Sequence, residues 1–157
     1  MKALLIALLA LTTSLLADVT EESFGKLALD QPAAKVLEIL GKPKAVGKDT
    51  LWGATGDWVQ EWRYPSIGLE LAMASDKKSG PKRLLSITAT KGCNFATKRG
   101  ISIGSKEAAV NKAYAKERDK EQSVPGESFI AGSVYGGVIF TFKAGIVTDI
   151  FIGAAAE

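Results

Sequence analysis

Residues 26–42 read KLALDQPAAKVLEILGK and residues 100–116 read GISIGSKEAAVNKAYAK, so the two stretches align at a constant offset of 74 residues. Five apolar positions coincide in this alignment: Leu27 with Ile101, Leu29 with Ile103, Ala34 with Ala108, Val36 with Val110, and Leu40 with Tyr114. A self-match at a fixed period is the mark of an internal repeat. The two stretches therefore predict a duplicated fold, and chance similarity between two amphipathic helices is the alternative.

Each aligned stretch predicts an extended lead-in followed by a short helix. In the first stretch Pro32 suits the first helical turn, where its missing N–H costs little. Val36, Leu37 and Leu40 then recur at helical spacing and form an apolar stripe suited to packing. Gly41 is expected to end this helix.

Alternating strands are expected downstream of each helix. In DWVQEWRY, residues 57–64, one side of a strand would carry Trp58, Gln60, Trp62 and Tyr64, and the other Val59, Glu61 and Arg63. In GVIFTF, residues 137–142, one face would carry Val138, Phe140 and Phe142. Residues 51–74 align loosely with residues 129–152. The chain therefore predicts an α+β fold of tandem duplicated helix and antiparallel β-meander units, with the helices packed on one sheet face. The two repeats are expected at about 24–92 and 97–153 of one domain.

The first 17 residues, MKALLIALLALTTSLLA, have the form of a secretory signal peptide. A positive charge at Lys2 precedes an apolar run, and the small residue Ala17 precedes Asp18. The alternative is a buried or membrane-spanning helix, but such a segment would rise only ~22 Å against a hydrocarbon core of roughly 30 Å. We therefore expect one exported domain, residues 18–157, that is periplasmic or secreted and has no transmembrane helix after cleavage.

The composition argues against catalysis. The chain has no histidine and one cysteine, which excludes a histidine-activated nucleophile, a His-ligated metal and an intrachain disulfide. Glu61 and Glu70 offer a carboxylate pair for acid–base chemistry, but the neighbouring Arg63 favours a surface ion-pair ladder. We expect no enzyme activity, no cofactor and no metal site. Cys93 is expected to be buried and inert, with a disulfide-linked dimer through Cys93 as the alternative.

Aromatic side chains are the first candidates for partner binding, because large aromatics are enriched where proteins meet. The candidates are Trp52, Trp58, Trp62 and Tyr135. Trp58 and Trp62 lie on an alternating strand, so burial in the core is the competing explanation. Trp52 in LWGATG and Tyr135 in AGSVYGG lie in glycine-bearing turns that can project a side chain into solvent.

Basic side chains form a second candidate site. The basic patch consists of Lys77, Lys78, Lys82 and Arg83. Export argues against nucleic acid as its ligand, although such patches bind nucleic acid by counterion release. A solvated hairpin explains the composition of DKKSGPK, residues 76–82, and contact with anionic lipid or polymer is the functional alternative.

The motifs VLEILGKP, residues 36–43, and RGISIGSKEAAV, residues 99–110, resemble the repeat unit of the β-lactamase inhibitor protein (BLIP) fold. The same unit is similar to that of the outer-membrane assembly lipoproteins of the SmpA/OmlA family. The resemblance covers residues from about 24 to 153 and implies a binding or scaffolding role without catalysis. The chain departs from both families, because it lacks a lipobox cysteine and the cysteine pair that braces the inhibitor.

Together these observations predict an exported, non-enzymatic binding or scaffold protein. Its expected partner is a protein in the cell envelope or outside the cell, recognised through the concave face of the sheet and the aromatic loops. The alternative is an envelope-associated structural protein that contacts anionic lipid or polymer through the basic turn.

Overall fold

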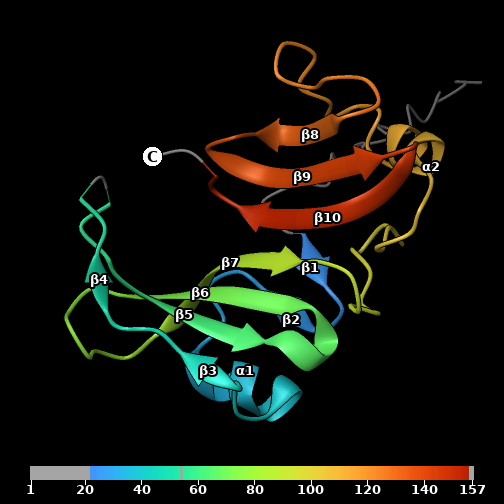
Figure 1. Ribbon diagram of the computed structural model, residues 1–157. Coiled ribbons are helices and arrows are strands. Elements are labelled where there is room, and N and C mark those ends of the chain that lie inside the picture. Colours follow the sequence, from blue (N-terminus) through green and yellow to red (C-terminus); the bar gives the residue numbers. More distant parts are fainter. Residues whose placement is uncertain (1–21, 54, 156–157) are drawn as a thin grey trace, which may run out of the picture.

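The computed structural model describes residues 22–53 and 55–155, which form a hairpin, two short helices and a large antiparallel sheet (Figure 1). The hairpin is β1 (Ser23–Phe24) with β2 (Leu27–Ala28), and the helices are α1 (Ala33–Leu40) and α2 (Glu107–Ala113). The sheet comprises β3 (Ala45–Val46), β4 (Thr50–Leu51), β5 (Trp58–Tyr64), β6 (Leu69–Ser75), β7 (Arg83–Ala89), β8 (Ser128–Ser133), β9 (Gly136–Lys143) and β10 (Ile146–Gly153). A 3₁₀ turn, η2 (Pro65–Ile67), joins β5 to β6. The predicted signal peptide, residues 1–17, lies outside the described residues.

The sheet consists of two meanders that meet at its centre. The strand order is β3-β5-β6-β7-β10-β9-β8, with β4 also paired to β5. The meanders are joined by β7 and β10 through only three residue pairs, Ile87 with Ile152, Thr88 with Phe151, and Ala89 with Ile150. Each half supplies one short helix followed by three long strands (Figure 1). The duplication with repeats at 24–92 and 97–153 stays a prediction.

The predicted α+β class is wrong, because the protein is mostly β, with 44% strand and 14% helix. The helices have 8 and 7 residues, and each buries one side chain, Val36 in α1 and Val110 in α2. Leu37, which belongs to the predicted apolar stripe, is 37% exposed. The expected layer of helices packed on one sheet face is therefore not formed, since a helix of two turns is too short to bury a full stripe.

The downstream part of the repeat alignment matches strands that occupy different positions in the sheet. Aligning residues 51–74 with 129–152 matches β5 to β9. In the sheet β5 is two strands away from β7 at the centre, whereas β9 is next to β10. Counted outward from the central pair, β9 corresponds to β6 and β8 corresponds to β5. Alternation of side chains recurs in every strand, so it identifies strands without telling one from the next.

The apolar core lies on one face of the sheet. Trp62, Leu71 and Ile87 come from the first meander, and Phe140 and Ile150 come from the second. Side chains from outside the sheet join the same core: Phe24 and Leu27 of the β1–β2 hairpin, Cys93 and Ile101 of the segment between the meanders, and Val36 and Val110 of the helices. The second face of the sheet is partly exposed.

Candidate functional site

The second face of the sheet carries a row of side chains that crosses both meanders. The register places six residues side by side, one from each long strand: Arg63, Glu70, Thr88, Phe151, Ile139 and Ile130. We call this the cross-sheet row. Arg63 and Glu70 are exposed, Thr88, Phe151 and Ile139 are half-buried, and Ile130 is buried. The row therefore changes from charged to apolar along its length.

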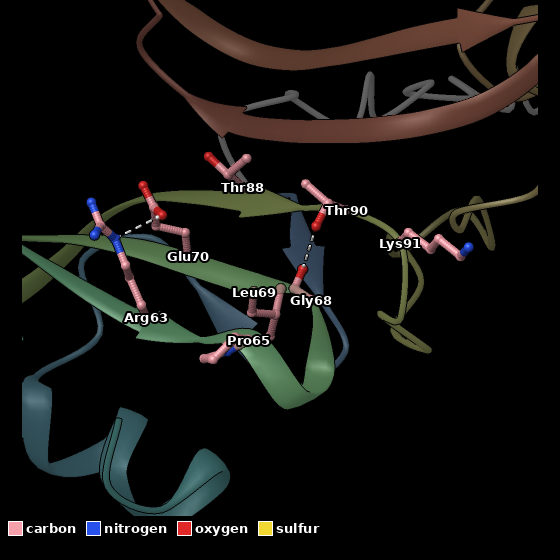
Figure 2. Close-up of a pocket in the computed structure, with 8 residues that line it drawn as sticks. All are labelled: Arg63, Pro65, Gly68, Leu69, Glu70, Thr88, Thr90 and Lys91. Atoms are coloured by element: carbon pink, nitrogen blue, oxygen red, sulfur yellow. Dashed lines mark hydrogen bonds and ion pairs between the residues drawn. The ribbon is translucent and has the colours of Figure 1, made fainter. Parts of the chain in front are cut away.

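The charged end of the row is an ion-pair ladder beside a hollow of about 330 Å³ (Figure 2). The Nε of Arg63 donates to Glu70 at 3.1 Å, and its second guanidinium nitrogen donates to Glu61. Figure 2 shows Thr88, Thr90 and Lys91 along the same hollow. Glu61 and Glu70 therefore both pair with Arg63. This is the ion-pair ladder that the sequence favoured over an acid–base pair.

The two loop aromatics lie at one end of the sheet. Because every neighbouring pair of strands is antiparallel, the loops before β5, between β6 and β7, and before β9 share that end. They contain Trp52, the basic turn and Tyr135 respectively, on the left of Figure 1. Tyr135 is 71% exposed, whereas Trp52 is half-buried. The three sets of candidates predicted from separate motifs thus share one end of the sheet.

The strand tryptophans lie on the core side. Trp62 is 8% exposed, and its indole N–H donates to the side-chain oxygen of Gln60 at 2.9 Å. Trp58 is half-buried, and the amine of Lys78 lies 5.3 Å from the centre of its ring. Trp62 is therefore a core residue, and the ring of Trp58 makes a cation–π contact with Lys78. We therefore retain Trp52 and Tyr135, but not Trp58 and Trp62, as surface candidates.

Half of the basic patch is neutralised by ion pairs. Lys82 pairs with Asp49 at 2.5 Å, and the side chains are only 9% and 8% exposed. Arg83 pairs with Asp57 at 3.2 Å and also approaches Asp30 and Asp76. Lys77 and Lys78 are exposed. Two of the four predicted cations are thus held in ion pairs. These pairs could not be predicted from the sequence, because Asp30, Asp49 and Asp57 lie far away along the chain.

The signals for other sites are limited. Cys93 is unpaired and buried, and desolvation raises the pKa of its thiol. Residues 22–53 and 55–155 contain no cluster of three or more side chains suited to hold a metal. In the same part of the chain no helix is long and apolar enough to cross a membrane.

Sequence reasoning missed the apolar half of the cross-sheet row. In IVTDIFI, residues 146–152, strict alternation would place Val147 on the same side as Asp149 and Phe151. A bulge between Val147 and Asp149 breaks the register, so Val147 is buried while Phe151 lies on the second face. The alternation of Ile139 with Phe140 was the only signal in the sequence for this half of the row.

Comparisons with protein-family models, curated proteins and solved structures found no match to the chain. The resemblance to the BLIP and SmpA/OmlA repeat unit therefore stays a prediction. The fold and the surface therefore define only a class: a mostly β domain whose second sheet face is partly exposed.

Proposed function

We propose that this chain is an exported, non-enzymatic binding protein that recognises a protein partner in the cell envelope. The observation that carries the proposal is the cross-sheet row, in which Thr88 lies between exposed Arg63 and Glu70 on one side and half-buried Phe151 and Ile139 on the other. An apolar centre beside charged side chains is the usual composition of a protein-binding patch. Tyr135 adds a large exposed aromatic at one end of the same sheet.

The contact with anionic lipid or polymer is less well supported. Ion pairs to Asp49 and Asp57 reduce the patch to two exposed cations, Lys77 and Lys78. Surface charges of this kind are screened by salt, so binding through them would weaken at high ionic strength. We therefore propose the protein partner, and treat salt-sensitive binding to lipid vesicles as the competing outcome.

The test is affinity capture from the envelope of the source cell with residues 18–157 as bait. Thr88→Arg places a long cation in the middle of the row and should abolish capture. Asn94→Arg, at an exposed loop position, introduces the same side chain elsewhere and should leave capture unchanged. Equal capture by both variants would contradict the proposal, and circular dichroism would establish that both fold.

The loop aromatics are tested in the same way. A Trp52→Ala, Tyr135→Ala double variant should lose most of the capture, because large aromatic side chains contribute heavily to interfaces. Val124→Ala truncates another exposed apolar residue, 45% exposed, in the loop before β8 at the opposite end of the sheet, and serves as the control. A double variant that retains its partner would remove the aromatic loops from the proposal.

We further propose that the protein acts without a disulfide through Cys93. The side chain is 5% exposed, and burial raises the pKa of the thiol, so both access and thiolate formation are disfavoured. A thiol reagent at neutral pH should label Cys93 only after unfolding. Rapid labelling of the folded protein, or a reductant-sensitive dimer on a gel, would contradict this.

A further inference from the structure

The two edges of the sheet differ in whether their outward backbone groups are hydrogen-bonded. At the β8 edge the amide of Asp119 donates to the carbonyl of Ile130 at 2.8 Å, and the amide of Gly132 donates to the carbonyl of Glu117 at 2.8 Å. The hydroxyl of Ser123 accepts from the amide of Ile130 at 3.0 Å. The loop before β8 therefore satisfies the outward backbone groups of that edge, which blocks pairing with another strand.

The opposite edge, formed by β3 and β4, has backbone groups that point outward. The amide of Gly47 donates to the carbonyl of Glu61 at 2.8 Å, and that of Trp52 donates to Asp57 at 2.9 Å. Successive amides of a strand alternate in direction, so the amides of the preceding residues, Val46 and Leu51, face away from β5. Both side chains are 53% exposed. We call residues 44–51 the open edge.

The open edge is positively charged. Lys42, Lys44 and Lys48 are all exposed, and none of them joins an ion pair within the part of the chain that the structure describes. Asp49 lies among them, but its carboxylate is bound by Lys82 and by the amide of Ser79 at 2.7 Å. Glu61 on the neighbouring strand is paired with Arg63. The lysines at the edge are therefore not neutralised by nearby acids.

A hollow of about 280 Å³ lies beside the same edge. Its lining is Gly47, Lys48, Thr50, Trp52, Val59 and Glu61. Trp52 and Val59 supply apolar surface, and Gly47 has no side chain to occupy the space. A strand laid along the open edge could place one apolar side chain in this hollow while its neighbours point away, because alternate residues of a strand face opposite sides.

From these features we propose that the open edge binds an extended acidic segment of a partner protein by strand addition. The backbone of that segment pairs with the outward groups of Val46 and Leu51, its acidic side chains lie near Lys44 and Lys48, and one apolar side chain contacts Trp52. A second copy of this chain is disfavoured, because its edge carries the same lysines and like charges opposite each other repel. The inference rests on the proposed function, since it names the kind of partner.

The probe is a short capped peptide of alternating valine and glutamate, with a valine–lysine peptide as its matched control. Titration into isotope-labelled residues 18–157 at low salt should move the amide signals of 44–52 with the glutamate peptide alone. Hydrogen exchange at Val46 and Leu51 should slow by roughly tenfold when the peptide is bound. Shifts confined to other regions, an equal response to both peptides, or no response would overturn the proposal.

Two sets of variants keep the test specific. Val46→Pro removes an outward amide that the ladder with β5 does not use, so the fold should survive and peptide binding should be lost. Val46→Ala keeps that amide and should bind within a few-fold of the parent. A Lys44→Glu, Lys48→Glu variant should prefer the valine–lysine peptide, whereas Lys77→Glu, Lys78→Glu makes the same charge change and should not. Binding that survives Val46→Pro in a folded protein would overturn strand addition.

The outcomes separate this inference from the proposed function. Capture that is lost with Thr88→Arg but unaffected by Val46→Pro would support the cross-sheet row and reject the open edge. Peptide binding at 44–52 without any captured partner would support strand addition at the open edge and reject the proposed envelope partner.

Discussion

The hydroxyl of Tyr114 donates a 2.9 Å hydrogen bond to the carboxylate of Glu22, a residue 92 positions earlier in the chain. The second oxygen of Glu22 accepts from the amide of Lys98 at 2.7 Å. The guanidinium of Arg99 lies 4.5 Å from the centre of the Tyr114 ring and is bound to Glu117 through two hydrogen bonds. This buried polar cluster ties the start of the described chain to the end of α2.

Removal of the Tyr114 hydroxyl should destabilise the fold. Tyr114→Phe removes the hydrogen bond to a buried carboxylate oxygen of Glu22, which should lower the free energy of unfolding by about 1–3 kcal/mol. Tyr135→Phe removes a hydroxyl from a 71% exposed side chain and should change stability little. Urea unfolding followed by circular dichroism measures both variants, and equal stabilities would contradict the role given to the cluster.

Stability should decline in alkaline solution because of Tyr114. Burial raises the pKa of Tyr114 above its ordinary value of 10.0, since desolvation disfavours the phenolate. The unfolded chain therefore loses this proton first, so the contribution of Tyr114 is complete below pH 10 and is lost as pH rises toward the folded pKa. The difference in unfolding free energy between parent and Tyr114→Phe should shrink above pH 10, by up to about 1.4 kcal/mol per pH unit. A constant difference would reject the linkage.

The buried ion pair of Lys82 and Asp49 should stabilise the turn between β6 and β7. Lys82→Ala leaves the Asp49 carboxylate with the Ser79 amide alone and should cost about 2 kcal/mol. Lys77→Ala removes an exposed cation from the same turn and should cost less than about 0.5 kcal/mol. The hydrogen bond from Lys82 lowers the pKa of Asp49, so this contribution is present above pH 3.8 and is lost as pH falls through the folded pKa. Equal costs for both variants would contradict the assignment.

Gly68 should tolerate no side chain. Its φ is +59°, and an added Cβ would lie 2.6 Å from the carbonyl oxygen of Lys91. Gly145 has φ +72° with no atom within 4 Å of an added Cβ, so it isolates the conformational cost. Gly145→Ala should cost about 1 kcal/mol, and Gly68→Ala about 3 kcal/mol or more, because the backbone must also shift. Thermal and urea unfolding of the two variants would test this, and similar losses would contradict the steric argument.

The sequence predicted the strands better than it predicted the class of fold. Alternation identified the strand that contains Trp58 and Trp62, because one buried face imposes a period of two on any strand. The sequence overestimated how far the helices pack on the sheet. An apolar stripe such as Val36, Leu37 and Leu40 is present whether or not the sheet covers all of it. The candidate loops of Trp52 and Tyr135 were found from glycine and aromatic composition, but the cross-sheet row was not.

What the sequence determined by itself is local: the alternating strands, the glycine turns, the absence of histidine and the placement of an exposed aromatic at Tyr135. The tertiary structure alone decided which of these face each other. The pairing of β7 with β10 brought Phe151 into line with Thr88, the bulge in β10 turned Val147 to the core, and distant aspartates neutralised Lys82 and Arg83. The reason is physical: a side chain's neighbours across a sheet depend on register, and a shift of one residue turns every following side chain to the other face.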